Sequence, residues 1–204
     1  TGDIHEEAYD VLVMAPGASP VKPRSIGGID GKNVYTVRNV ADIVHLKDGL
    51  EAAGAENTAV IGGGFIGIEV AENLAKAGKK VTVVEAMSQI LAPFDYDMVQ
   101  MLHKELLDNG VSLIVDDGVK TIEEKQITLA SGKTVPADAV ILAIGVAPET
   151  GLAKAAGLEI GETGGILVDH NYRTSDKNIY AVGDAIEVFD RMTGKPSRLA
   201  LAGP

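Results

Sequence analysis

The chain has 204 residues, which is enough for one or two domain cores, and its 29 acidic against 18 basic residues give a net charge of −11. That charge disfavours nucleic acid and anionic membrane as partners; no stretch has the length of a membrane span and no secretory leader is present, so we expect a cytoplasmic protein. The lack of cysteine excludes disulfides and thiol catalysis within the chain, and the four scattered histidines lack metal-ligand spacing, so we expect no metal site.

The first predicted element is an apolar run at residues 9–15 (YDVLVMA), which is long enough for one buried strand. Proline and glycine stop this run and recur up to residue 31, where we expect a loop. A short strand is predicted at residues 34–37. Asn39 then suits the N-cap of a helix that ends near Gly54, and the predicted buried face of this helix consists of Val40, Ile43, Val44 and Leu50.

Residues 58–85 (TAVIGGGFIGIEVAENLAKAGKKVTVVE) form the part of the chain with the clearest pattern, a strand, a glycine turn, a helix and a second strand. Gly62, Gly64 and Gly67 match G-x-G-x-x-G, in which the first glycine permits the turn, the second lets the backbone approach a pyrophosphate and the third lets helix and strand pack closely. The amino end of the helix offers unpaired N–H groups to phosphates. Its predicted buried stripe consists of Ile66, Val70, Leu74 and Ala77.

Glu85 ends the second strand, where a carboxylate can accept hydrogen bonds from the hydroxyls of an adenosine ribose. A 2′-phosphate would be repelled there, and no arginine follows to bind one, so the sequence favours NAD(H). In the alternative reading, the glycines only make a tight turn and Glu85 is a solvated strand end. The complete strand, turn, helix and strand context favours a dinucleotide site.

The rest of the central region changes from helical to alternating periodicity. Residues 88–94 read as a connection, and Asp95 suits the cap of a helix that ends at Gly110 and buries Met98, Met101, Leu102 and Leu106. A strand is predicted at 111–115. Three short alternating runs then indicate a small antiparallel meander, at residues 119–122, 126–129 and 134–135.

An apolar strand at residues 138–145 closes the region and resembles the first strand, because VLVMAPGASP and VILAIGVAPE both run into glycine and proline. This repetition suggests two crossings of one domain boundary. We therefore predict an α/β fold in which a Rossmann-like parallel sheet with a β-meander, residues 34–147, is inserted between residues 1–33 and 148–204. One continuous domain with two similar core strands is the alternative.

The last flank contains IYAVGDA, a short strand that is followed by Gly183 and Asp184. A carboxylate at the carboxyl end of a strand can accept a hydrogen bond from a ligand hydroxyl. Asp184 could equally be a helix cap.

Four motifs resemble those of FAD-dependent pyridine nucleotide-disulfide oxidoreductases: YDVLVMAPGA, VIGGGFIGIEVAENL with VTVVE, DAVILAIGVAPE and NIYAVGDA, in the family's order. The resemblance implies that residues 34–147 bind NAD(H) and that the flanks, 1–33 and 148–204, are parts of an FAD-binding domain. Ala15-Pro16-Gly17, ILAPFDYDM and the terminal LAGP look most like the branch of coenzyme A-disulfide reductases, NADH oxidases and persulfide reductases.

The resemblance also implies roles for individual residues. Phe65 matches the aromatic residue that covers the nicotinamide pocket until NADH enters, although a core aromatic at the helix start is an alternative, and Glu69 matches the acid near nicotinamide and flavin. The implied NAD-binding residues are Gly62, Gly63, Gly64, Phe65, Ile66, Gly67, Glu85 and Gly145. The implied FAD-binding residues are Ala15, Pro16, Gly17, Gly183 and Asp184, whereas Ala147 and Glu149 stand where relatives often have arginine and asparagine.

The implied reaction is hydride transfer from NADH to FAD, followed by electron transfer to a disulfide, persulfide or oxygen acceptor through a redox cysteine outside this chain. The intact protein is expected to be a homodimer. We expect the isolated chain to bind NADH weakly, to retain little or no FAD and to be inactive. A flavoprotein of the ferredoxin-reductase or nitrite-reductase type and a non-catalytic nucleotide-binding module are the alternatives.

Overall fold

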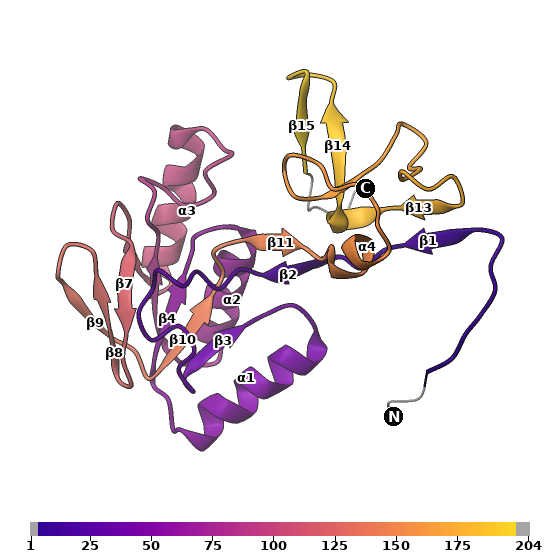
Figure 1. Cartoon of the computed structure of the whole chain (residues 1–204). Coiled ribbons are helices and arrows are strands. Elements are labelled where there is room, and N and C mark those ends of the chain that lie inside the picture. Colours follow the sequence, from indigo (N-terminus) through magenta and orange to yellow (C-terminus); the bar gives the residue numbers. More distant parts are fainter. Residues whose placement is uncertain (1–3, 199–204) are drawn as a thin grey trace. The chain divides into compact units, whose positions relative to one another are not determined.

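The computed structural model describes residues 4–198, and the chain divides into two compact units (Figure 1). The central unit is Pro20–Gly145, and the flanking unit combines Thr1–Ser19 with Val146–Pro204. The predicted boundary at residue 33 lies later than the first boundary of the central unit. Residues 20–33 pack with that unit because the Gly27 N–H donates to the Lys120 carbonyl at 3.0 Å and Ile29 is buried beneath the meander. The LAGP motif lies outside the described residues.

A five-stranded parallel sheet forms the middle of the central unit, in the order β3-β10-β4-β5-β6. Its strands are β3 (Val34–Thr36), β4 (Asn57–Ile61), β5 (Lys80–Val84), β6 (Ser112–Ile114) and β10 (Ala139–Leu142). The chain leaves β4 for β5 on one side and returns as β10 on the other, so the strand order reverses between β4 and β10. Ligands of such sheets bind outside the carboxyl ends of the strands at this point.

Three helices cover one face of this sheet and the meander covers the other (Figure 1). The helices are α1 (Val40–Ala52), α2 (Phe65–Lys76) and α3 (Tyr96–Asp108), and the meander is β7 (Val119–Ile122), β8 (Gln126–Leu129) and β9 (Thr134–Pro136). Successive strand residues alternate between the faces. In β4, Val60 joins the helix-side core, while Ala59 and Ile61 join the meander-side core. The predicted α/β sheet with an antiparallel meander is confirmed.

The predicted helix faces are partly wrong. The buried helix residues are Leu46 and Leu50 in α1, Gly67, Ala71 and Leu74 in α2, and Val99 and Leu106 in α3. The predicted core residues that are exposed are Val40, Ile43, Val44, Ile66, Ala77, Met98, Met101 and Leu102. In α2, close approach of the helix to the sheet selects the small residues Gly67 and Ala71, and a search for bulky apolar side chains misses them.

The described part of the flanking unit contains short strands, a short α-helix and a 3₁₀ helix. Its elements are β1 (Leu12–Met14), β2 (Ala18–Pro20), β11 (Val146–Pro148), α4 (Gly151–Ala155), β12 (Ile166–Leu167), β13 (Ile179–Ala181), the 3₁₀ helix η1 (Gly183–Ala185), β14 (Ile186–Asp190) and β15 (Lys195–Ser197). The predicted buried strand at 9–15 shrinks to β1, in which Met14 is buried and Val13 is 60% exposed. In the described part of the chain β1 pairs with β13 alone. Met14 packs in the core of this unit, whereas Leu12 and Val13 stay exposed.

Asp138 links the amino ends of β4 and β10 by hydrogen bonds, at the end of the sheet opposite the glycine turn. Its Oδ2 accepts the backbone N–H groups of Asn57 at 2.9 Å and Glu56 at 3.1 Å, and its Oδ1 accepts Lys125 Nζ at 3.2 Å. The backbone hydrogen bond from Asn57 is the largest cause that lowers the pKa of Asp138 from 3.8 to about 2, against the opposing effect of burial. The carboxylate therefore stabilises the folded state while it is ionised.

We expect Asp138→Asn to lower the free energy of unfolding by about 2 kcal/mol at pH 7, the equivalent of this pKa shift. Because the folded-state pKa is depressed, the contribution is present above the ordinary pKa and is lost as the pH falls through about 2. Urea unfolding at pH 7, 4 and 3 should show that the difference in the free energy of unfolding between the variant and the wild type becomes smaller as the pH falls. Asp48→Asn, at an exposed position of α1, is the control, and a pH-independent difference would contradict this explanation.

Candidate functional site

The glycine turn follows β4 and has the steric properties that the motif predicts. Gly62 has φ +102°, and a Cβ there would collide with the carbonyl oxygen of Ala143, which follows β10. A Cβ on Gly67 would collide with the Gly62 carbonyl, because α2 crosses β4 closely at this point. The first and third glycines are therefore required by the fold itself.

Gly64 differs, because a Cβ there would meet no atom within 4 Å. Gly64 is the N-cap of the 12-residue helix α2, and within residues 4–198 no side chain caps the first N–H groups of the helix. Unpaired N–H groups and the helix dipole favour an anion there. The turn thus fits the pyrophosphate of a dinucleotide.

Glu85 follows β5 and is held beside the turn by two backbone groups. Its Oε2 accepts the Gly63 N–H at 2.7 Å and its Oε1 accepts the Met87 N–H at 2.8 Å. The carboxylate is half-buried, and each of its oxygens has a further lone pair that can accept a ribose hydroxyl. These two hydrogen bonds set the position and the orientation of the carboxylate beside the turn.

Phe65 and Glu69 occupy the first turns of α2, and both are exposed. Phe65 is 50% exposed and contacts the Phe94 ring edge-on, with centroids 6.0 Å apart and planes at 71°. The alternative reading of Phe65 as a core aromatic is therefore wrong. Glu69 and Ile66 line a groove between α1 and α2, and within residues 4–198 the Glu69 side chain has no hydrogen-bond or ion-pair partner.

Gly145 lies beyond β10 at the same edge of the sheet. It has φ +103°, a Cβ there would meet no atom within 4 Å, and its carbonyl accepts the Val21 N–H at 3.0 Å. The registers align Ile61 of β4 with Val84 of β5 and with Leu142 of β10. All of the predicted NAD-binding residues are therefore gathered at the carboxyl ends of β4, β5 and β10.

The predicted FAD-binding residues gather at one edge of the flanking unit. β1 and β13 are parallel, with Met14 opposite Ala181, and the Val182 N–H donates to the Met14 carbonyl at 3.0 Å. Both strand ends therefore lead to the same place, where the chain continues as Ala15-Pro16-Gly17 and as Gly183-Asp184. Asp184 is half-buried inside η1, whose N-cap is Val182, so Asp184 is not the cap of this helix.

Glu149, which departs from the family pattern, forms contacts within the flanking unit. Its Oε2 accepts the Ser19 hydroxyl at 3.0 Å, and its backbone N–H donates to the Gly17 carbonyl at 2.9 Å. The side chain thus helps to join the two segments that carry β2 and β11, which pair with each other.

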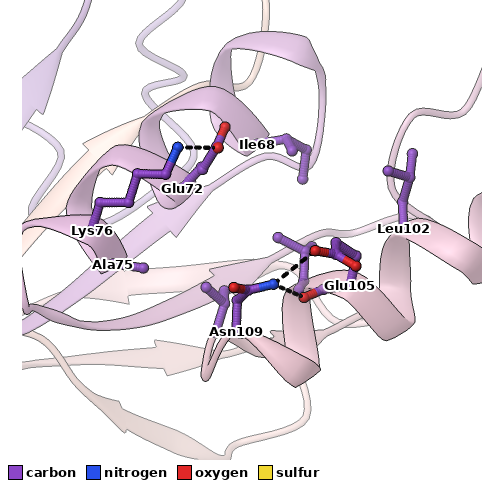
Figure 2. A pocket seen from close by; sticks show the side chains of 9 residues that line it. Ile68, Glu72, Ala75, Lys76, Leu102, Glu105 and Asn109 are labelled. Atoms are coloured by element: carbon purple, nitrogen blue, oxygen red, sulfur yellow. Dashed lines mark hydrogen bonds and ion pairs between the residues drawn. The ribbon is translucent and has the colours of Figure 1, made fainter.

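Two grooves lie between neighbouring helices of the central unit. The α1–α2 groove has a volume of about 690 Å³, and the α2–α3 groove, shown in Figure 2, has about 370 Å³. Along the α2–α3 groove Lys76 pairs with Glu72, and Asn109 donates to the backbone and side-chain oxygens of Glu105 at 2.8 and 2.9 Å. The polar groups drawn in Figure 2 thus bind one another, and neither groove includes a glycine of the turn.

Over the described range 4–198, the structure has no group of three or more His, Cys, Asp or Glu side chains that could hold a metal ion. No helix in that range has both the length and the apolar character needed to cross a membrane.

The segment between β5 and α3 belongs to the site, although the sequence analysis treated residues 88–94 as a simple connection. The Leu91 N–H donates to the Gly63 carbonyl at 2.8 Å, and Ile90 is fully buried against Gly63, where a Cβ on the glycine would collide with it. The signal that could have revealed this is the apolar run ILAPF inside an expected surface connection.

Comparison with known proteins extends these observations. The sequence profile of the pyridine nucleotide-disulphide oxidoreductase family matches residues 1–202. An NADH oxidase of Methanocaldococcus jannaschii is 39% identical over 95% of this chain, which covers 44% of that protein. The solved structure of reduced Bacillus anthracis CoADR-RHD is similar, with a TM-score of 0.90 and 45% identity over 96% of this chain and 35% of that one. The structure of an NAD-dependent persulfide reductase from A. fulgidus has a TM-score of 0.89 and 39% identity over 95% of this chain and 36% of that one. The chain spans less than half the length of each.

Proposed function

The chain belongs to the pyridine nucleotide-disulphide oxidoreductase family, in the branch of coenzyme A-disulfide reductases, NADH oxidases and persulfide reductases, and on this basis we propose that it is the NADH-binding portion of such a flavoprotein. The family is FAD-dependent and uses NAD(P)H. The observation that carries the proposal is the joint placement of the open Gly64 turn and the fixed Glu85 carboxylate at the switch point of the central sheet.

In this proposal the residues of the central unit bind and orient NADH. The N–H groups at the start of α2 bind the pyrophosphate, and Glu85 accepts the hydroxyls of the adenosine ribose. Glu85 also disfavours NADPH, because a 2′-phosphate would bring a second negative charge against the carboxylate. Phe65 covers the nicotinamide position until NADH enters, and Glu69 accepts a hydrogen bond close to the reacting ring.

The flanking unit supplies part of the flavin site. The strand ends that carry Ala15-Pro16-Gly17 and Gly183-Asp184 lie side by side, and glycine at these ends gives space for a cofactor while Asp184 offers a carboxylate to a flavin side-chain hydroxyl. FAD, when bound, would accept hydride from NADH and pass electrons to a disulfide, persulfide or oxygen acceptor. Because this chain has no cysteine, a redox cysteine would come from outside these 204 residues.

Glu69→Ala tests the catalytic part of this proposal in the intact flavoprotein. We expect the rate of flavin reduction at saturating NADH to fall by at least about tenfold, while the Kd of NADH stays within about twofold, because Glu69 acts on the reacting ring and not on the adenosine half. Stopped-flow absorbance at the flavin band measures both quantities. Glu72→Ala is the matched control, since Glu72 is an exposed carboxylate on the same helix but lines the other groove (Figure 2). Equal slowing by both variants, or by neither, would count against the assigned role and favour a non-catalytic nucleotide-binding module.

A further inference from the structure

Two aromatic rings from different elements touch at the amino end of α2. Phe65 is the first residue of this helix, and Phe94 lies in the segment between β5 and α3. The rings meet edge to face and are 50% and 43% exposed, so neither belongs to the core. The contacts of an exposed ring help to fix its position, and within residues 4–198 the aromatic contact of Phe65 is the one with Phe94.

The segment that carries Phe94 is fixed to the glycine turn by its backbone. The Leu91 N–H donates to the Gly63 carbonyl at 2.8 Å, and the Phe94 N–H donates to the Leu91 carbonyl at 2.9 Å. The Gln89 side-chain amide donates to the Phe94 carbonyl at 2.9 Å. Phe94 is therefore held at a set distance from the turn and from the start of α2.

Leu91, inside this segment, has φ +46°, which is unfavourable for a residue with a side chain. The conformation persists because Leu91 is buried in the helix-side core and because its N–H is bound to Gly63. A backbone that is held in such a conformation places the following residues in one arrangement. The position of Phe94 thus follows from the packing beneath the turn.

In the proposed function, a bound dinucleotide spans the start of α2. Glu85 lies on the side of the turn that would hold the adenosine half, and the open space above Gly64 would hold the pyrophosphate. In the proposed function, the nicotinamide half continues from the turn past the ring of Phe65, which is exposed. On the basis of the proposed function, we propose that Phe94 is a positioning residue that holds the Phe65 ring across the path of the nicotinamide half, so that nicotinamide binds only by breaking the contact between the two rings.

The proposal predicts a separation between two ligands. NAD⁺ contains the nicotinamide and ADP-ribose lacks it, and neither reduces the flavin, so calorimetric titration of the intact protein with each isolates the effect. In Phe94→Ala we expect the Kd of NAD⁺ to fall about two- to tenfold, the range for loss of one aromatic edge contact that favours the ligand-free arrangement, with the Kd of ADP-ribose unchanged. Phe94→Leu should lower the Kd of NAD⁺ by a smaller factor. Phe94→Tyr keeps an aromatic ring and should leave the ratio of the two Kd values as in the wild type.

Tyr96→Ala is the matched control, because Tyr96 is a 63% exposed aromatic residue close in sequence, and we expect it to change neither Kd. Equal shifts for NAD⁺ and ADP-ribose in Phe94→Ala and Phe94→Leu would mean that Phe94 only supports the turn, and they would overturn the proposal, as would no shift for either ligand. Failure of the wild-type protein to bind ADP-ribose would instead refute the dinucleotide site, and the inference with it.

Discussion

Gly62→Ala is expected to lower the free energy of unfolding of the chain by about 3 kcal/mol or more, because two penalties coincide at this position. The residue has φ +102°, which an alanine adopts only with strain, and the new methyl group would collide with the Ala143 carbonyl beside the end of β10. The shift of β10 needed to relieve the collision would disturb both cores of the central unit. Urea unfolding followed by circular dichroism measures the loss.

Gly64→Ala is the matched comparison, and it should separate nucleotide binding from stability. Gly64 has φ −76°, and a Cβ there meets no atom within 4 Å, so we expect the free energy of unfolding to stay within about 1 kcal/mol of the wild type. The methyl group would occupy the space in which the pyrophosphate would bind, so the Kd of NADH should rise at least about tenfold. Wild-type NADH affinity in Gly64→Ala would show that no phosphate rests above the turn.

Glu85→Gln is expected to weaken NADH binding by about ten- to hundredfold and to remove most of the discrimination against NADPH. Hydrogen bonds to a charged acceptor contribute about 1.5–3 kcal/mol each, and the amide keeps the size of the side chain while losing the charge and one acceptor. The 2′-phosphate of NADPH would no longer meet a carboxylate, so its Kd should approach that of NADH. Fluorescence titration with each nucleotide gives the ratio.

The change also breaks hydrogen bonds inside the free protein, so stability has to be measured beside affinity. An amide oxygen can still accept one of the two backbone N–H groups, from Gly63 or Met87, but the NH₂ group cannot accept the other. Glu56→Gln, which alters an exposed carboxylate just before β4 at the opposite edge of the sheet, is the control and should leave both affinities unchanged. If Glu85→Gln weakens the binding of NADH and of NADPH by the same factor, Glu85 does not bind the adenosine ribose.

The local chemistry of the glycine turn could be predicted from the sequence alone. Glycine spacing and short apolar runs are short-range signals, and they predicted β4, the turn, α2 and β5. The parallel pairing of these strands follows from the crossover helix between them, and it places Glu85 beside the turn. The meander was predictable for the same reason, because its period of two and its turn residues lie within 18 consecutive positions, 119–136.

The faces of the helices could not be predicted in the same way. The stripe of α2 that contacts the sheet is Gly67, Ala71 and Leu74, and two of these three residues have almost no apolar side chain. What selects them is the distance between helix and strand, which is a property of the packed unit. The role of residues 88–94 was missed for a related reason, since Ile90 is a core residue only because the chain folds back beneath Gly63.

The sequence by itself determined where the backbone turns, which strand ends carry polar groups and that those groups suit a dinucleotide, because each of these depends on residues that are neighbours along the chain. Only the tertiary structure decided which side chains are buried, how Glu85 is held by Gly63 and Met87, and that Phe94 meets Phe65. These contacts join segments that the chain brings together by folding, and their distances are set by packing across the sheet, which no local pattern contains.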